Sequence, residues 1–575
     1  MDSGLRADIA AWIDDDPDER DRAELRALLD SGADGAEAEL ADRFAGRLTF
    51  GTAGLRGAVG AGPNRMNRAV VRAATAAVAG WLLDGGGMPE VVVGCDARHR
   101  SAEFADEAAA VLAGAGVRVH LLPRPGPTPL LAFAVRHLGT GAGIMITASH
   151  NPAADNGYKL YLDDGAQVIP PVDADIEERI ATLGPLADIP VASLADPLVV
   201  RHGDEVAAAY LEAVTGAPAA PAPTPAGAGL KIVYTPMHGV AGELMLRAIE
   251  RAGFGAPHVV AAQASPDPDF PTVAFPNPEE PGALDLALAD ARATGADLVL
   301  ASDPDGDRLA VAVPATGATG APGAAGTAGT ADPGVTAGWR QLTGDQLGAL
   351  LGAFLLGDVA GPGELVATTI VSATLLSKVA AAAGAGYRET LTGFKWIARA
   401  ADGEPGARFV FGYEEALGYQ VGATVKDKDG IGAALAVLRL ATAAKQAGQT
   451  IAGAYDDLER AHGVHLTGQL SPRIGDPAEV MRRIRATPPA ELGGVPVEAV
   501  TDFADAGTGL PPSDVLRFAL AGSTRVAVRP SGTEPKIKAY LEVAEPPGDD
   551  LTAARAAAET RMAPLRDAVT ALLTS

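Results

Sequence analysis

The chain has 575 residues, more than one hydrophobic core usually organises, so we expect several domains. Apolar residues make up 47% and aromatic residues only 5%, which excludes disorder of the whole chain and is typical of α/β proteins with small side chains between helices and sheets. The formal charge of −26 argues against a nucleic-acid partner, because such binding needs Lys and Arg to neutralise phosphates.

The same composition bears on the compartment. A single cysteine, Cys95, excludes an intramolecular disulfide, and residues 1–10 lack the pattern of a secretory signal. No uncharged apolar run approaches the ~20 residues that cross a bilayer. The longest candidate, 70–83, carries Arg72 and predicts an amphipathic helix. We therefore expect a cytoplasmic protein with no membrane partner, whose oligomeric state the sequence leaves open.

The N-terminal part of the chain predicts a helical extension followed by an α/β domain. Residues 1–45 are charged and Ala-rich with helical spacing, and a glycine-rich stretch follows at 50–57. Short apolar runs then alternate with helical stretches, which predicts βαβ units in a mostly parallel sheet. The expected strands are 91–94, 117–122 and 144–147, and one expected helix is 101–113. We assign residues 46–206 to this domain.

A second alternation follows in the middle of the chain. It begins with an expected strand at 231–234, continues through a helix at 284–293 to a strand at 297–301, and reaches a hairpin that starts at 309–313. The stretches 217–229 and 315–338 are nearly all Ala, Gly, Pro and Thr, so they predict a linker and a mobile insertion. We place the remaining domains at 207–340, 341–462 and 463–575.

The first motif that carries chemistry surrounds a serine. Thr147-Ala148-Ser149-His150-Asn151-Pro152 comes directly after an apolar strand, where catalytic groups of open α/β sheets lie. A serine needs a charged or basic neighbour to act as a nucleophile. His150 is adjacent, and Lys159 follows after a turn that we predict at 155–157.

The second motif is Ser302-Asp303-Pro304-Asp305-Gly306-Asp307-Arg308, again immediately after an apolar strand. Three carboxylates at every second position repel one another when crowded, so their convergence predicts a bound cation. Oxygen ligands alone favour Mg²⁺ or Ca²⁺, and three ligands leave room for a phosphate oxygen on Mg²⁺.

The third motif is Arg529-Pro530-Ser531-Gly532-Thr533-Glu534-Pro535-Lys536, between two expected strands at 526–528 and 537–543. A glycine-containing loop between Arg and Lys supplies backbone N–H groups, positive charge and hydroxyls for a phosphate. Two further patterns offer carboxylates and cations for sugar hydroxyls: Gly393-Phe394-Lys395-Trp396 and Phe411-Gly412-Tyr413-Glu414-Glu415-Ala416. Lys426-Asp427-Lys428-Asp429-Gly430 adds an amine.

Taken together, these motifs resemble the α-D-phosphohexomutase family of phosphoglucomutases and phosphomannomutases, in order from residue 51 to 540. The sequence is most similar to the long subgroup that carries Gly-Thr-Ala-Gly-Leu-Arg, Gly-Phe-Lys-Trp-Ile and Gly-Tyr-Glu-Glu-Ala. That subgroup also includes phosphopentomutases and sugar-bisphosphate synthases. The resemblance implies four domains around a central cleft: three related α/β mixed-sheet domains and a smaller α+β C-terminal domain.

The resemblance also implies roles for individual residues. Ser149 matches the phosphoserine, which together with Asp303, Asp305 and Asp307 holds Mg²⁺. The other implied catalytic residues are His150, Lys159, Arg56 and Lys428. Arg308 matches a phosphate-neutralising arginine, and Lys395, Glu414 and Glu415 face the sugar. The implied clamp on the unreactive phosphate is Arg529, Ser531, Gly532, Thr533 and Lys536.

The implied activity is interconversion of hexose 1-phosphate and hexose 6-phosphate, of glucose or mannose, with a sugar 1,6-bisphosphate as intermediate and activator. Ala416 stands where many relatives carry serine, so the sugar preference cannot be carried over. A phosphopentomutase and a bisphosphate synthase therefore stay open. A phosphotransferase with an acyl phosphate on Asp303 also stays open, since Asp-x-Asp follows a strand, and so does a non-catalytic sugar-phosphate sensor.

Overall fold

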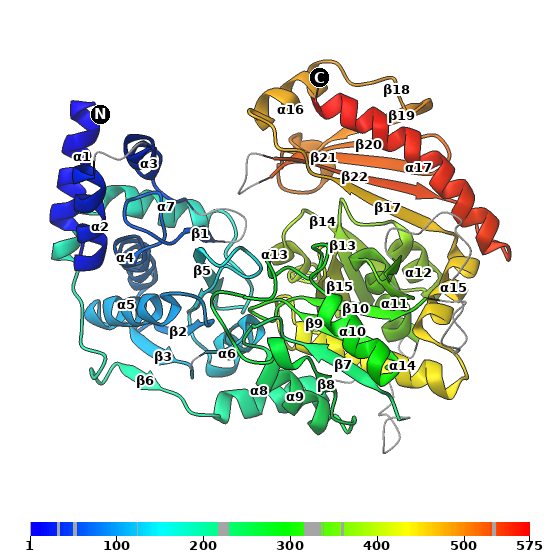
Figure 1. The fold of residues 1–575 in the computed structure, drawn as a ribbon, viewed down its shortest axis with the longest axis horizontal. Helices are drawn as coiled ribbons and strands as arrows, with labels where there is room; N and C mark the ends of the chain where they lie inside the picture. The colour runs from blue at the N-terminus through cyan, green and yellow to red at the C-terminus, as the bar shows by residue number, and fades with distance from the viewer. Residues whose placement is uncertain are drawn as a thin grey trace. The chain divides into compact units, whose positions relative to one another are not determined.

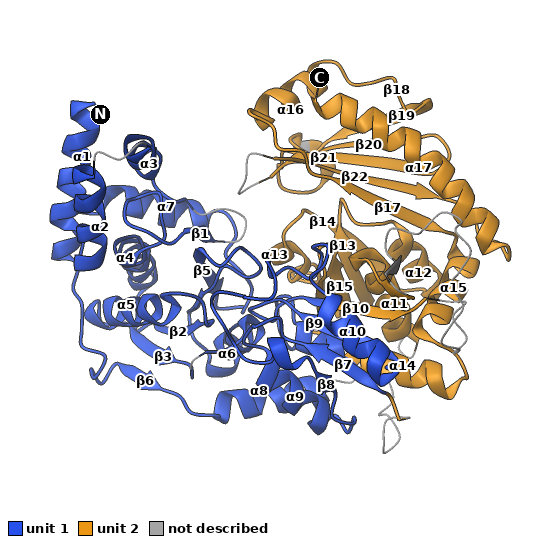
Figure 2. Cartoon of the chain, in the orientation of Figure 1, with its two compact units in different colours: residues 1–217, 231–309, 424–435 blue, residues 218–230, 310–423, 436–575 orange. Residues whose placement is uncertain are grey.

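The computed structural model describes residues 2–31, 35–49, 54–123, 125–216, 229–315, 335–336, 338–357, 361–531 and 536–574. The chain divides into two compact units, shown in Figure 2. Unit 1 comprises residues 1–217, 231–309 and 424–435, and unit 2 comprises residues 218–230, 310–423 and 436–575. Most of the predicted linker and insertion lies outside the described residues, as do the glycine-rich residues 50–53 and the loop residues Gly532 and Thr533.

Unit 1 begins with the predicted helical extension. Its helices are α1 (Ser3–Asp15), α2 (Glu19–Asp30) and α3 (Ala36–Arg43). The side chain of Asp18 caps α2 by accepting a hydrogen bond from the Arg20 amide. The apolar faces of the three helices share a small core with Ala61, and its buried helical members are Ile9, Ile13, Leu25 and Leu40. The extension is therefore packed onto the residues that follow it.

The main sheet of unit 1 is mixed. Its strands are β1 (Leu55–Ala58), β2 (Glu90–Cys95), β3 (Arg118–Leu121), β4 (Ala142–Ile146), β5 (Asp155–Leu162) and β6 (Val199–Arg201), in the order β1-β5-β4-β2-β3-β6. Strands β4, β2, β3 and β6 run parallel, whereas β5 pairs antiparallel with both β4 and β1. The predicted strands in this region are confirmed, and the sheet is parallel except at the β5 and β1 edge.

Helices cover both faces of this sheet (Figure 1). They are α4 (Arg68–Asp84), α5 (Ser101–Gly114), α6 (Thr128–Leu138) and α7 (Val172–Thr182), and α8 (Glu205–Gly216) packs against α6. Alternation along β2 directs Val91 and Val93 into the core under α4 and α5. Gly94 and Gly143 face α6 instead, where a Cβ on Gly143 would lie 2.5 Å from a Val135 methyl group, so glycine permits this close packing.

One local prediction in this unit is wrong. Residues Asp155 to Gly157, which we expected to form a turn, are the first residues of β5. The turn lies just before them, at 149–154. Gly157 is needed within the sheet, because a Cβ there would approach the carbonyl oxygens of Thr147 and Leu55 to 2.6 and 2.7 Å. Glycine stands at 157 because the neighbouring strands leave no room for a side chain, not because the chain turns there.

The rest of unit 1 contains a second set of parallel strands. Strand β7 (Ile232–Thr235) pairs in parallel with β8 (His258–Val259) and with β9 (Leu298–Ser302). Helices α9 (Gly242–Arg251) and α10 (Asp285–Thr294) belong to the same region. The predicted strands and helix are confirmed here, and β9 ends at the residue before Asp303.

Unit 2 begins with the predicted hairpin and continues into a four-stranded mixed sheet. Strand β10 (Leu309–Pro314) pairs antiparallel with β12 (Trp339–Gln341), which also pairs with β11 (Val335–Thr336). The mixed sheet has the order β14-β13-β15-β16, from strands β13 (Glu364–Thr369), β14 (Gly386–Thr390), β15 (Arg408–Glu414) and β16 (Gly418–Val421). Its helices are α11 (Gly344–Gly357), α12 (Leu375–Ala383), α13 (Phe394–Ile397), α14 (Gly430–Gln446, shared with unit 1) and α15 (Ile451–His462).

The C-terminal part of unit 2 is a fully antiparallel sheet with α17 (Leu551–Thr574) along one face (Figure 1). Its strands are β17 (His465–Leu470), β18 (Glu491–Leu492), β19 (Val495–Asp502), β20 (Leu516–Leu520), β21 (Thr524–Pro530) and β22 (Ile537–Ala544), and α16 (Pro477–Ala486) precedes β18. The order is β17-β22-β21-β20-β19-β18. Separated strands and helices of this kind match the expected α+β class. Among the described residues, no helix combines the length and apolar character that crossing a bilayer requires.

Candidate active site

Ser149 lies in the turn that follows β4, at the carboxyl end of a parallel strand. Its backbone has φ +54°, a left-handed conformation that a non-glycine residue adopts only when its surroundings enforce it. The Ser149 amide donates to Thr147 Oγ1 at 2.9 Å, and the Ser149 hydroxyl donates to Asp303 Oδ2 at 2.8 Å. His150 Nδ1 is 3.2 Å from the same hydroxyl oxygen. The turn therefore presents the serine to the aspartate motif.

Asp303, Asp305 and Asp307 converge on one point after β9. All three are fully buried, and they offer carboxylate oxygens that lie within 4.8 Å of one another. Burial and the charges of Asp305 and Asp307 raise the pKa of Asp303 well above its ordinary value. Within the described part of the chain, Asp305 Oδ1 and Asp307 Oδ1 are buried without a hydrogen-bond partner. Oxygens of this kind are suitable ligands for a hard cation, so the residues fit a metal site.

Two lysines share the charge of this cluster. Lys159 on β5 donates to Asp305 Oδ2 at 2.7 Å and to Asp307 Oδ2 at 2.9 Å, and Lys428 Nζ is 3.1 Å from Asp307 Oδ2. Burial alone would lower the pKa of Lys159, but Asp305 and Asp307 raise it above its ordinary value. Both lysines therefore lie beside the carboxylates, and Lys159 is protonated in this arrangement.

Lys428 reaches the cluster because its neighbours are held by unit 1. Asp427 Oδ2 accepts hydrogen bonds from Tyr161 Oη at 2.7 Å and from Gln167 Nε2 at 2.8 Å. Asp429 Oδ1 accepts one from Tyr210 Oη at 2.7 Å. These buried contacts explain why residues 424–435 belong to unit 1, and the assignment of the segment to a sugar-binding domain at 341–462 stays a prediction.

Two arginines and a histidine complete the site in unit 1. Arg56 on β1 donates to Asn151 Oδ1 at 2.8 Å, which connects it to the serine turn. Arg308 lies 3.9 Å from Asp307 and 3.5 Å from Glu279. Burial and the charges of Arg308 and Arg56 lower the pKa of His150 well below its ordinary value, so its imidazole is neutral near pH 7.

In unit 2 the predicted sugar-binding residues lie around the end of β15. Glu414 Oε1 accepts a hydrogen bond from the Gly393 amide at 3.1 Å, and Glu415 Oε2 accepts from Thr369 and Ser372 at 3.2 and 3.1 Å. Burial, followed by the charge of Glu414, raises the pKa of Glu415 to about 7. Lys395 is buried in α13.

Arg529 is the best-placed cation of the predicted phosphate clamp. It is the second-last residue of β21, donates to Tyr540 Oη at 2.9 Å, and interacts electrostatically with Glu415 and Glu414. The Ser531 amide donates to the Lys536 carbonyl at 2.9 Å, which closes the loop at its base. Unit 2 therefore brings the predicted clamp residues Arg529, Ser531 and Lys536 together, and the charge of Arg529 interacts with the glutamate pair. Gly532 and Thr533 lie outside the described residues.

Sequence reasoning missed two buried residues that touch the site. Thr128 at the start of α6 donates from its hydroxyl to Asp305 Oδ2 at 2.6 Å and from its amide to the Asp305 carbonyl at 2.9 Å. Arg98 donates to backbone carbonyls of the serine turn. Asp96 and Arg98 directly follow β2, so their position after a strand, the signal that found Ser149, could have found them.

Family models match the chain along most of its length. The four models are described as phosphoglucomutase/phosphomannomutase alpha/beta/alpha domains I, II and III and C-terminal domain. They match residues 47–185, 208–317, 343–460 and 481–559, respectively. The architecture thus has four domains, three of the α/β/α type and one C-terminal domain, as expected.

Individual relatives carry related names. The chain is 40% identical to a "Probable phosphomannomutase" of Haemophilus influenzae over 83% of this chain and 93% of the relative. It is 34% identical to a "Probable phosphoribomutase" of Schizosaccharomyces pombe over 94% of each. A phosphoglucomutase/phosphomannomutase family protein of Burkholderia thailandensis has a similar fold, with a TM-score of 0.66, 22% identity, and coverage of 92% of this chain and 98% of that one.

Proposed function

This chain belongs to the phosphoglucomutase/phosphomannomutase family, and we propose that it interconverts hexose 1-phosphate and hexose 6-phosphate through phosphorylated Ser149. The chain is a phosphosugar mutase, an isomerase that moves a phosphoryl group within one small sugar molecule. The observation that carries the proposal is the bond from the Ser149 hydroxyl to Asp303, which joins the serine to the buried aspartate cluster.

The chemistry that we propose has two transfers. In the first, the bond between phosphorus and Ser149 Oγ breaks, a bond forms between phosphorus and the free sugar hydroxyl, and the proton of that hydroxyl ends on Ser149 Oγ. The product is a sugar 1,6-bisphosphate. In the second transfer, the other phosphate of this bisphosphate passes to Ser149 by the reverse exchange, and the isomerised monophosphate leaves. Atoms and electric charge balance over the cycle, so the enzyme needs no co-reactant beyond the bisphosphate that phosphorylates Ser149.

Three groups of unit 1 are our candidates for carrying the proton. His150 is 3.2 Å from Ser149 Oγ, and its lowered pKa keeps the imidazole neutral, so it has a lone pair for a proton although it is a weak base. Lys159 and Lys428 lie on Asp307, and each must release its proton before it can act as a base. Positioning and electrostatics dominate phosphoryl transfer, so these residues act mainly by their placement.

Mg²⁺ is the cation that we assign to the aspartate cluster. Asp303, Asp305 and Asp307 would hold it with an oxygen of the Ser149 phosphate, and when bound it supplies positive charge that stabilises the transferring phosphoryl group. Arg56 and Arg308 add fixed positive charge in the same unit. A phosphoserine and a sugar phosphate each bring about two negative charges at pH 7, which these cations offset.

In unit 2 we assign the remaining roles. Glu414, Glu415 and Lys395 are proposed to bind sugar hydroxyls. Arg529, Ser531, Gly532, Thr533 and Lys536 are proposed to bind the phosphate that does not react. Arg529 is the strongest of these candidates, because a guanidinium presents a fork of donors that matches phosphate oxygens.

Relatives named for a hexose and for a pentose both match this chain, so a pentose phosphate is the second candidate substrate. A parallel assay with glucose 1-phosphate, mannose 1-phosphate and ribose 1-phosphate, each with its bisphosphate, decides between them. We expect the highest kcat/KM on a hexose phosphate. A kcat/KM on ribose 1-phosphate that is tenfold higher than on either hexose phosphate would assign a phosphopentomutase instead. Net accumulation of bisphosphate during turnover would mark a bisphosphate synthase.

The chemical stability of the phosphoenzyme separates Ser149 from Asp303 as the phosphorylated residue. A seryl phosphate resists hydroxylamine, whereas an aspartyl phosphate is cleaved by it. We expect the phosphate on the wild-type protein to survive hydroxylamine, and we expect Ser149→Ala to carry no such phosphate. Protein-bound phosphate that hydroxylamine removes would favour the acyl phosphate on Asp303.

A further inference from the structure

We propose that Arg98 is a positioning residue for the transfer reaction: its guanidinium holds the turn that presents Ser149. This inference rests on the proposed function for its kinetic consequence, but its structural part concerns only the turn itself. Arg98 follows β2, two strands away in sequence from the serine motif and beside it in the sheet.

The contacts of Arg98 cover the whole serine turn. Its Nη2 donates to the carbonyl oxygens of Ser149 at 2.8 Å and Asn151 at 2.6 Å. Its Nη1 donates to those of Pro152 at 2.7 Å and Asp155 at 3.1 Å. One side chain thus binds four carbonyls of residues 149–155, including that of Ser149 itself. Among the described residues, no other side chain donates to so many carbonyl oxygens of this turn.

The turn needs such a partner for two physical reasons. Ser149 holds a left-handed backbone conformation at φ +54°, which is unfavourable for a non-glycine residue and persists only where the surroundings enforce it. Buried carbonyl oxygens also need donors, and the amides of this turn already bond within it, from Asn151 to Ala148 and from Asp155 to Pro152. A planar fork of donors can reach several carbonyls at once, which a lysine ammonium cannot do from one point.

Arg98 is itself fixed on three sides. Its side chain is 1% exposed and lies 3.4 Å from Asp96, whose Oδ1 accepts from the Arg98 amide at 3.0 Å. Asp96 Oδ1 also accepts from Ser101 Oγ at 2.6 Å, which closes the loop between β2 and α5. The ring of Phe270 lies against the guanidinium, with 5.0 Å between its centroid and Cζ. Because the guanidinium is fixed in this way, it can hold the carbonyl groups of the turn in place.

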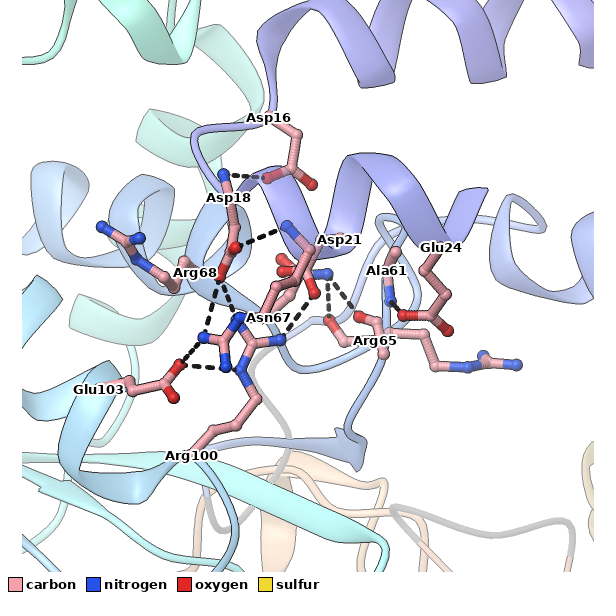
Figure 3. Close-up of polar contacts among 12 residues, drawn as sticks. Asp16, Asp18, Asp21, Glu24, Ala61, Arg65, Asn67, Arg68, Arg100 and Glu103 are labelled. Atoms are coloured by element: carbon pink, nitrogen blue, oxygen red, sulfur yellow. Dashed lines mark hydrogen bonds and ion pairs between the residues drawn. The ribbon is translucent and has the colours of Figure 1, made fainter. Parts of the chain in front are cut away.

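The loop that carries Arg98 is anchored on its far side by the N-terminal helices (Figure 3). Arg100 has φ +63° and immediately precedes α5. Its guanidinium binds Asp18 at 2.5 Å and Asp21 at 2.7 Å, both on or beside α2. Glu103 adds a third carboxylate at 3.2 Å. The loop from Asp96 to Ser101 therefore contacts the helical extension through Arg100 and the serine turn through Arg98.

The test replaces Arg98 by lysine, which keeps the charge and loses the fork. The matched control is Arg72→Lys: Arg72 is also largely buried in unit 1, but it pairs with Glu107 between α4 and α5. For Arg98→Lys we expect kcat to fall about 100-fold with KM within about threefold, because misplacing a reacting group by about 1 Å costs about that much. In metal-free protein without substrate, amide hydrogens of residues 149–155 should exchange about tenfold faster. Arg72→Lys should change neither quantity more than about threefold.

Each outcome decides. A kcat of Arg98→Lys within threefold of wild type, or unchanged exchange at 149–155, overturns the inference, and so does an equal loss in both variants. If Arg98→Lys does not fold, Phe270→Leu takes its place, and a drop in kcat of about tenfold at constant KM supports the inference, whereas an unchanged kcat refutes it. If the wild-type enzyme moves no phosphate on any sugar, the proposed function fails, and the exchange measurement still tests the positioning role.

Discussion

Replacing Asp307 by asparagine removes the negative charge that two buried lysines share. Asp307 accepts from Lys159 at 2.9 Å and lies 3.1 Å from Lys428, and both its own side chain and that of Lys159 are almost completely buried. Burial alone would raise the pKa of Asp307, but Lys159, Lys428 and Arg308 lower it below its ordinary value. The fold therefore stabilises this carboxylate on balance, in spite of the two aspartates beside it.

The expected cost follows from these contacts. Removing one partner of a buried ion pair costs about 3–5 kcal/mol. Here both lysines lose the carboxylate that they share, and Lys159 keeps only Asp305. In a body the size of unit 1, each kcal/mol lowers the thermal midpoint by about 2 °C, so Asp307→Asn should lower it by about 6–10 °C. The measurement is thermal unfolding with EDTA present, which keeps bound metal out of the comparison.

Asp204→Asn is the matched control for this variant. Asp204 forms an ion pair with Arg247, with both contacts at 2.7 Å, but its side chain is 66% exposed. Exposed pairs contribute about 0–1 kcal/mol, so this control should move the midpoint by no more than about 2 °C. Equal shifts in the two variants, or a midpoint of Asp307→Asn at or above that of wild type, would refute the electrostatic reasoning.

Three further predictions concern metal, protons and packing. Chelation should abolish turnover and Mg²⁺ should restore it, and full activity after exhaustive chelation would contradict the metal assignment. Burial raises the pKa of Asp345 from 3.8 to about 6, so the folded state binds the extra proton and unit 2 loses about 3 kcal/mol of stability as pH rises from about 4 to about 6. Asp345→Asn should remove that loss, and thermal midpoints of the two proteins across this pH range check it. Gly157→Ala should destabilise unit 1 by about 3 kcal/mol, because its Cβ meets two backbone oxygens, and a midpoint within 1 °C of wild type would disprove the crowding.

The sequence was sufficient to predict where some of the candidate residues lie, while their roles stay predictions. Ser149 and Asp303 each follow an apolar strand, and parallel strands present such positions at one edge of a sheet, so their motifs could be recognised without coordinates. The α/β alternation likewise predicted the strands and helices around them. Domain boundaries at 206, 340 and 462 stay predictions.

Residues that act across long sequence separations could not be predicted in the same way. The position of Arg98 after β2 is a local signal, but it does not show that its partners lie in a turn more than fifty residues away. Thr128, whose aspartate partner is 177 residues away, carries no local pattern. The position of Lys428 depends on side chains from unit 1 that hold Asp427 and Asp429. Asp155 to Gly157 have turn-forming composition, and only the pairing of β5 with its neighbours shows that they are a strand.

The central claim is that Ser149 carries the phosphoryl group during turnover, and peptide mass spectrometry of the working enzyme measures it directly. After incubation with sugar 1,6-bisphosphate, we predict one phosphate on the peptide that contains Ser149, and its loss when sugar monophosphate is added in excess. A charged enzyme with phosphate elsewhere in the chain, or full activity in Ser149→Ala, would contradict the account.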